Sequence, residues 1–441
     1  MSKKERVAFI LFSPFLFFPY MCGNYANICY INYGIFLLFA SILVVLSSDK
    51  PRLLLSPAFF SAFYLYICFF LGDLLLRDGI YLDYRHYDYY SSWSHHQFSN
   101  TYTNIAVYLA LLSYYVCPKH KHLAIIKQGF DSRKRNLFMI SLFWAITLLV
   151  IIKASESVAS VFVSIACVLS VALIYTIKIN IKNKYRFLIY LIVIFAFAIA
   201  DSDDKRNSIF LFYVLALVEL PNLVKIRVKH IVDGIVIACA LFFAVISMSV
   251  IRATEGRVST SDLIKTVPQY LTSETAMAMV ANNFEVDYTY IDTFQPIEFV
   301  ANNPTLKMWG ESYIKPLFLI IPRSLMPNKP ESAMIKYTKE YDYGAAVEGY
   351  CLPICISSEA FWNFGSFGLI VVFIIYYFLN SFYCSGLNTL TFERKSRYTQ
   401  IGFLFIMYLN IMLIRGSGLD IFVLQSLIGL TTLFTIRLFI H

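Results

Sequence analysis

The stretch SSEAFWNFGSFGLIVVFIIYYFLNSFYC, residues 357–384, decides the class of fold. It contains a single charged side chain, Glu359, and most of its other residues are aromatic or aliphatic. A helix of about 17–25 apolar residues crosses the hydrocarbon core of a bilayer, which is about 30 Å thick. The stretch is therefore predicted to be a transmembrane helix, with Glu359 near one of its ends.

Apolar runs of this kind recur along the whole chain. The 441 residues are 58% hydrophobic and 15% charged, with a mean hydropathy of +0.63, which is more apolar than a soluble protein of this length. We expect an all-α polytopic membrane protein of about 12 transmembrane helices. The candidate spans lie near residues 7–22, 28–47, 53–76, 102–117, 136–152, 158–177, 187–200, 208–224, 231–251, 357–384, 399–414 and 420–439.

The first span has the basic start of a signal peptide, MSKKER, but no small-residue cleavage site follows it. We expect it to remain in the protein. If the N-terminus is cytoplasmic, the segments on that side hold 22 Lys and Arg residues, against 6 in the short loops of the other side. Because positive residues favour cytoplasmic loops, both termini are predicted to be cytoplasmic. Topology and anionic headgroups also account for the net charge of +9, so no nucleic-acid partner is expected.

One long hydrophilic insertion, residues 252–356, separates spans 1–9 (residues 1–251) from spans 10–12 (residues 357–441). The topology places it on the outer side, and a connection of this length is commonly functional. It contains IPRSLMPNKP, residues 321–330, whose three prolines exclude an ordinary membrane helix. The prolines would hold Arg323 and its neighbours rigidly near the membrane surface.

Arginines mark the predicted outer surface at several points. Arg206 precedes a span, Arg252 and Arg257 follow one, and Arg323 lies in the proline-rich stretch. Guanidinium groups bind phosphate with two parallel hydrogen bonds and stay charged at any relevant pH, so such a set suits a lipid-linked diphosphate. The alternative is that each arginine only marks where a helix leaves the bilayer.

Aromatic residues accompany these arginines. The outer segments YLDYRHYDYYSSWSHHQF, EVDYTYIDTF and KYTKEYDYG are rich in tyrosine, which suits stacking on sugar rings. An interfacial aromatic belt explains them equally well. Cys351 and Cys355, in CLPIC, could pair on an oxidising outer side.

The chain resembles the bacterial oligosaccharide repeat-unit polymerases, the Wzy-type O-antigen and capsule polymerases. The resemblance rests on the number of spans, one large outer loop late in the chain, and three sequence segments within residues 309–368. These segments are GESYIKPLFLIIP, PRSLMPNKP and SSEAFWNFGSFG. It implies a GT-C-like glycosyltransferase architecture in the bacterial inner membrane.

The resemblance also implies the reaction. Such an enzyme transfers a growing glycan from undecaprenyl diphosphate to a sugar hydroxyl of the next undecaprenyl-diphosphate-linked repeat unit, at the outer face of the membrane. Arg323, Arg252 and Arg206 would stabilise charge on the leaving diphosphate. No nucleotide, metal or other cofactor is expected. The implied partners are the lipid-linked oligosaccharides, membrane lipids, and a chain-length regulator and flippase of the same pathway.

The attacking hydroxyl needs a base or at least an oriented acceptor. Glu359 is the first candidate, followed by Glu311 and Glu274, although each of the three also suits a structural or sugar-orienting role. The residues expected to bind substrate are Arg257, Lys329, Glu311, Glu274, Tyr313, Trp309 and Asn363.

Three alternative functions stay open. A non-catalytic membrane scaffold would explain the composition, but it gives no reason for an arginine flanked by prolines at the outer surface. An O-antigen ligase would share the architecture, but the long insertion lacks the histidine expected of a ligase. A lipid-linked oligosaccharide flippase would show two similar halves and short loops, which the single long insertion disfavours.

Overall fold

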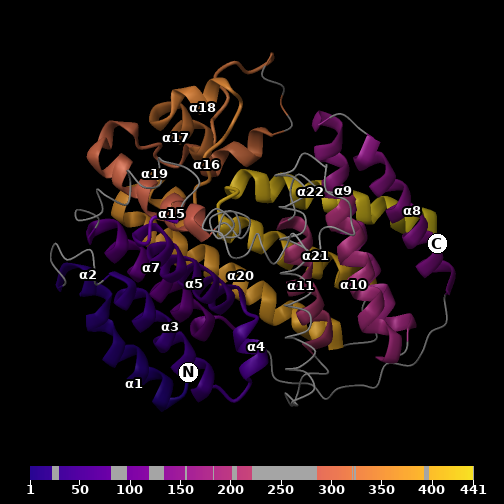
Figure 1. The fold of residues 1–441 in the computed structure, drawn as a ribbon, viewed down its shortest axis with the longest axis horizontal. Helices are drawn as coiled ribbons and strands as arrows, with labels where there is room; N and C mark the ends of the chain where they lie inside the picture. The colour runs from indigo at the N-terminus through magenta and orange to yellow at the C-terminus, as the bar shows by residue number, and fades with distance from the viewer. Residues whose placement is uncertain are drawn as a thin grey trace. The chain divides into compact units, whose positions relative to one another are not determined.

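The computed structural model shows an all-helical protein over the part of the chain that it describes (Figure 1). That part comprises residues 1–21, 29–80, 97–118, 134–153, 156–181, 183–200, 206–220, 286–319, 321, 324–391 and 397–440. Within these ranges the only β pairing is an isolated bridge between Ile354 and Ser417. The chain forms two compact units, which we describe separately.

Unit 1 consists of residues 1–118, 253–382 and 412–423. Its N-terminal elements are α1 (Lys3–Phe12), η1 (Ser13–Phe17), α2 (Phe18–Met21), α3 (Cys29–Leu46), α4 (Lys50–Leu54), α5 (Pro57–Arg77) and α7 (Gln97–Val116). The Ser2 side chain caps α1, and Glu5 completes a capping box. The first expected span is helical but not continuous, because Pro14 and Pro19 divide it into three short pieces.

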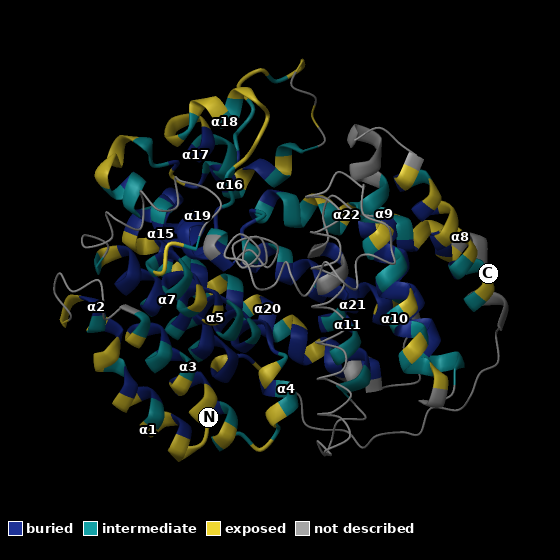
Figure 2. Ribbon diagram, in the orientation of Figure 1, coloured by how far each residue is buried: buried dark blue, intermediate teal, exposed yellow. Residues whose placement is uncertain are grey.

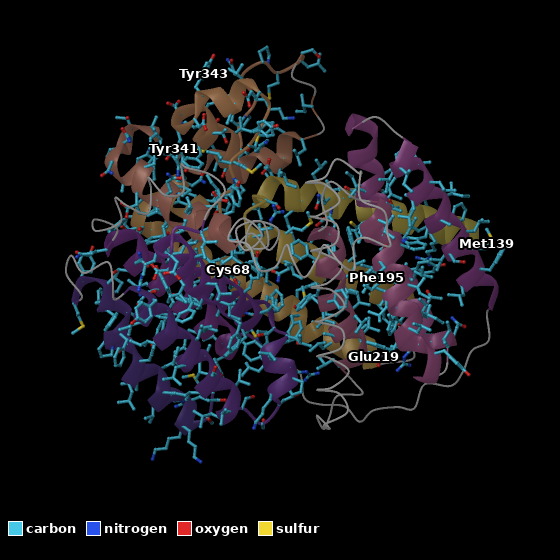
Figure 3. The ribbon with its side chains drawn as sticks, in the orientation of Figure 1. Cys68, Met139, Phe195, Glu219, Tyr341 and Tyr343 are labelled. Atoms are coloured by element: carbon cyan, nitrogen blue, oxygen red, sulfur yellow. The ribbon has the colours of Figure 1, made fainter. Side chains whose placement is uncertain are left out.

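The described part of the long insertion belongs to the same unit. Its elements are α15 (Val286–Asn302), η5 (Pro304–Leu306), α16 (Glu311–Ile314), η6 (Lys315–Phe318), α17 (Ala333–Tyr341) and α18 (Tyr343–Val347). Figure 3 labels Tyr341 and Tyr343 in its α17–α18 part, and Cys68 of α5 in the interior.

Helix α15 packs lengthwise against α5. Gly72 of α5 leaves room for Tyr290, because a Cβ atom at position 72 would lie 3.0 Å from the Tyr290 Cβ. Tyr64 and Thr289 share a hydrogen bond of 3.4 Å between their hydroxyls. Tyr290 and Phe294 are buried there among aromatic rings of α3 and α5. The part of the insertion that forms α15 is therefore built into the helical bundle of unit 1.

The stretch 357–384 forms two helices joined by a tight turn. Helix α19 (Ile356–Phe364) ends at Gly365, whose φ of 57° favours glycine, and η7 (Gly365–Phe367) leads into α20 (Gly368–Thr391). A Cβ atom on Gly368 would lie 2.5 Å from the Ala360 carbonyl oxygen. Both glycines thus have the architectural role of allowing a tight entry into the span.

Unit 2 consists of residues 119–252, 383–411 and 424–441. Its helices are α8 (Lys134–Lys153), α9 (Glu156–Asn180), α10 (Asn183–Ala200) and α11 (Arg206–Glu219), with parts of α20, α21 (Arg397–Arg415) and α22 (Leu419–Ile440). Polar contacts cross its apolar interior: the Trp144 indole donates to the Ser170 hydroxyl at 2.8 Å, and the Tyr408 hydroxyl donates to the Asn207 side chain at 3.2 Å. These bonds satisfy polar groups that burial would otherwise penalise.

Five helices in the described ranges are long and apolar enough to cross a membrane: Pro57–Arg77, Phe162–Asn180, Ile356–Leu387, Tyr398–Arg415 and Leu419–Arg437. Four shorter apolar helices accompany them. Exposed residues, yellow in Figure 2, lie on several of these helices. Large hydrophobic residues are among them, as a lipid-facing surface requires. These helices indicate a multi-pass membrane protein. Of the twelve expected spans, the one at 231–251 lies outside the described residues.

Candidate functional site

A buried hydrogen-bonded cluster joins three separate segments of unit 1. The Ser312 hydroxyl of α16 donates to Glu359 Oε1 of α19 at 2.9 Å, and the Leu419 backbone N–H at the start of α22 donates to Glu359 Oε2 at 3.1 Å. The Asn363 amide donates to the Ser312 hydroxyl and to the Glu359 carbonyl, both at 2.8 Å. Glu359 is 3% exposed. Its carboxylate therefore connects α16, α19 and α22, and α22 presents its positive N-terminal end to it.

An ion pair lies beside this cluster. Lys315 Nζ is 2.5 Å from Asp420 Oδ2, and both side chains are almost completely buried. Asp420 occupies the first turn of α22, where a negative charge is favourable. A buried pair of this kind contributes little net stability, but removing one partner leaves an uncompensated charge.

Three buried polar atoms around the cluster have no hydrogen-bond partner among the residues that the structure describes: the Tyr313 hydroxyl, Asn363 Oδ1 and Asp420 Oδ1. Burial, followed by the neighbouring Glu359 and Tyr102, raises the pKa of Tyr313 well above its usual value, so its hydroxyl keeps its proton. The cluster thus offers both donors and acceptors to a polar group entering it.

The turn before α16 has an unusual backbone. Trp309 (φ 52°) and Gly310 (φ 93°) are both left-handed, and the Glu311 N–H donates to the Met308 carbonyl at 3.0 Å. This arrangement is a type I′ turn, which normally carries Asn, Asp or Gly at both central positions. A tryptophan there costs about 1–2 kcal/mol of backbone strain. The Trp309 side chain is 77% exposed.

The lysine of the proline-rich stretch after η6 hydrogen-bonds back to the start of that stretch. Lys329 Nζ donates to the Leu319 carbonyl at 3.3 Å and to the Ile321 carbonyl at 3.1 Å. Glu311 Oε1 accepts from the Glu331 N–H at 3.2 Å and fixes the far end of the stretch. In this structure Lys329 and Glu311 therefore shape the stretch that contains Arg323.

The structure brings together three of the residues expected at the site: Glu359, Asn363 and Tyr313. Trp309 points outward, and Glu311 and Lys329 contact the proline-rich stretch. The other candidates, Arg323, Arg252, Arg257 and Glu274, lie outside the described residues. Arg206 begins α11 in unit 2, but its side chain is not described.

Sequence reasoning missed three members of the cluster: Ser312, Lys315 and Asp420. Ser312 and Lys315 lie within GESYIKP, and a lysine between apolar residues was a usable signal. Asp420 follows GSG at the start of a span, where an acidic side chain suits a helix N-terminus. Among the described residues, no three His, Cys, Asp or Glu side chains are grouped as metal ligands would be.

Cys351 and Cys355 are both free thiols in the structure. Cys351 is exposed, whereas Cys355 is buried, accepts from the Thr293 hydroxyl at 3.0 Å and faces the Arg415 carbonyl at 3.7 Å. Burial raises the pKa of Cys355 to about 12. The two thiols do not form the disulfide considered from the sequence.

Comparison with protein-family models, with curated proteins and with solved structures gives no match for this chain.

Proposed function

We propose that the protein is a membrane glycosyltransferase that polymerises lipid-linked oligosaccharide repeat units. It would work at the outer face of the bacterial inner membrane, with both termini in the cytoplasm. The growing glycan would pass from undecaprenyl diphosphate to a hydroxyl of the next lipid-linked repeat unit. The product would be O-antigen or a similar surface polysaccharide.

One observation carries the proposal. Two of the segments that resemble the polymerases, GESYIKPLFLIIP and SSEAFWNFGSFG, meet through the buried bond between Ser312 and Glu359, 47 residues apart. Segments that the resemblance singles out separately thus share one polar cluster at the start of an apolar helix. A chain that only spans the membrane needs no such cluster, because burying carboxylates and a lysine there has a cost.

The proposed reaction assigns distinct tasks to these groups. A C–O bond forms between the acceptor hydroxyl and the donor sugar, while the bond from that sugar to the diphosphate breaks. Arg323, with Arg252 and Arg206, would stabilise the negative charge that leaves with the diphosphate. Both Glu359 oxygens already accept hydrogen bonds, so Glu359 suits a positioning role better than that of the base.

The direct test is Arg323→Ala in cells that lack the chromosomal gene. We expect long polysaccharide to disappear from the surface while single repeat units remain and the protein is still inserted in normal amount. Arg437→Ala, which removes an arginine from the last turn of α22, is the matched control and should leave the polymer unchanged. Normal polymer length in Arg323→Ala would exclude the role assigned to Arg323.

The gene deletion itself separates the alternatives. Loss of a polymerase leaves single repeat units attached to the surface lipid, whereas loss of a flippase leaves no repeat units outside. Loss of a ligase leaves long polymer on its lipid carrier. Either of the last two results would replace the proposed function.

A further inference from the structure

The short segment from α16 to η6, Glu311–Phe318, has its polar and apolar sides reversed. Ser312 and Lys315 are buried, whereas Ile314 is 48% exposed and Leu317 is 78% exposed. A helical segment at a water-facing surface shows the opposite pattern, with apolar residues inside and polar residues outside. The outward side of this segment is therefore shaped for an apolar surrounding.

Residues close by in the chain are also apolar and exposed. Trp309, just before α16, is 77% exposed, and Leu325, in the proline-rich stretch, is 78% exposed. Single exposed apolar residues are ordinary, but this group places four of them within a short length of chain. We call Trp309, Ile314, Leu317 and Leu325 the outward apolar group.

Two backbone features hold this group outward. The left-handed turn at Trp309 and Gly310 is tied to the body of unit 1, because the Met308 N–H donates to the Trp362 carbonyl at 3.0 Å. The Lys329 ammonium closes the following stretch on the Leu319 and Ile321 carbonyls. The tryptophan thus stays exposed although its backbone conformation is unfavourable.

We propose that the outward apolar group inserts into the lipid headgroup and acyl-chain boundary of the membrane that the protein spans. Tryptophan is enriched at that boundary, where its ring contacts acyl chains and its N–H stays near water. The bilayer is the occupant that the fold favours, because the same chain contains helices able to cross it. Contact of the outward apolar group with the bilayer would hold the Ser312–Glu359 cluster at the level of the membrane surface. This inference concerns lipid contact and holds whatever reaction the protein catalyses.

The test uses tryptophan fluorescence in lipid nanodiscs, which leave both membrane faces open to solutes. The signal of Trp309 is the difference between wild type and Trp309→Phe, since the other three tryptophans, Trp93, Trp144 and Trp362, are present in both proteins. In nanodiscs made with lipids brominated near the headgroup end of their acyl chains, we expect this difference signal to lose most of its intensity. Iodide in the water should quench it little, and its emission should be shifted to the blue.

Two further variants make the test independent of one side chain. Leu317→Trp in the Trp309→Phe background should show the same quenching by brominated lipid. Glu348→Trp in that background is the control, since Glu348 is an exposed acidic residue of unit 1, and its signal should respond to iodide instead. All variants should elute as the wild-type protein does on size exclusion.

The proposal is overturned if the Trp309 and Leu317→Trp signals are quenched by iodide and not by brominated lipid, because the group then faces water. It is also overturned if neither agent quenches them. That result would mean that another protein, a second copy or a bound polyprenyl tail covers the group.

Discussion

Replacing Glu359 tests the buried cluster most directly. In Glu359→Ala, the Ser312 hydroxyl and the Leu419 N–H lose their common acceptor in a place where the side chain is only 3% exposed. Each buried donor left without a partner costs about 1–3 kcal/mol, so the two together cost about 2–6 kcal/mol. Glu359→Gln keeps the shape and one acceptor oxygen, but an NH2 group replaces the other oxygen. One of the two donors therefore loses its acceptor, which costs about 1–3 kcal/mol.

Thermal unfolding of the purified protein in detergent, followed by intrinsic fluorescence at a fixed scan rate, measures the difference. A protein of this size shifts its midpoint by about 1 °C per kcal/mol, so we expect a loss of about 2–6 °C for the alanine variant and about 1–3 °C for the glutamine variant. Glu311→Ala is the matched control. Its carboxylate is less buried and accepts one backbone N–H, so its midpoint should move by about 1 °C or less.

The reasoning is refuted if Glu359→Ala unfolds within about 1 °C of wild type, because the carboxylate then holds nothing together. Polymer formation separates positioning from proton transfer. With a positioning role, Glu359→Gln still forms polymer; a base would lose about 10²–10⁴-fold in rate at unchanged stability.

Two other predictions follow from neighbouring groups. Lys315→Met leaves Asp420 buried without its cation and should lower the free energy of unfolding by about 3–5 kcal/mol. The double variant with Asp420→Asn should recover most of that loss in the same unfolding assay. Equal losses in the single and double variants would contradict the pairing. For the thiols, Cys351 should react with iodoacetamide in the folded protein, with the signal lost in Cys351→Ser, whereas Cys355 should react only after unfolding. Because burial raises the pKa of Cys351, its labelling should rise about tenfold per pH unit up to and beyond the usual thiol range, and a plateau below pH 8 would contradict this.

The long apolar runs were the most predictable part of the fold. The run at 53–76 corresponds to α5, Pro57–Arg77, because uninterrupted apolar sequence leaves a helix as the way to satisfy its backbone in lipid. Helix α15 was not predicted. Its residues VDYTYIDTFQPIEFVAN contain Pro296 and several polar groups, which suggested an outer aromatic loop. The buried residues Tyr290, Ile291, Phe294 and Ile297 nevertheless recur at helical spacing, and that period was the available signal.

A residue of the candidate site could be predicted only where its charge or polarity differed from that of its neighbours in the sequence. Glu359 drew attention because it is a lone charge in an apolar stretch, and the structure gives it partners. The pair of Lys315 and Asp420 spans 105 residues. The sequence around either residue does not indicate its partner, because the pairing depends on how helix ends that are far apart in the chain pack together.

The packing of α15 on α5 can form only late in the synthesis of the protein. Tyr64 and its partner Thr289 are 225 residues apart, and at about 5–20 residues per second the ribosome needs about 10–45 s to produce the second after the first. During that interval the notch at Gly72 has no Tyr290 to fill it. Until α15 is made, lipid or an insertion factor must cover the face of α5 around Gly72. A nascent chain that stops before residue 286 would therefore be a substrate for membrane proteases, although its first helices have already been made.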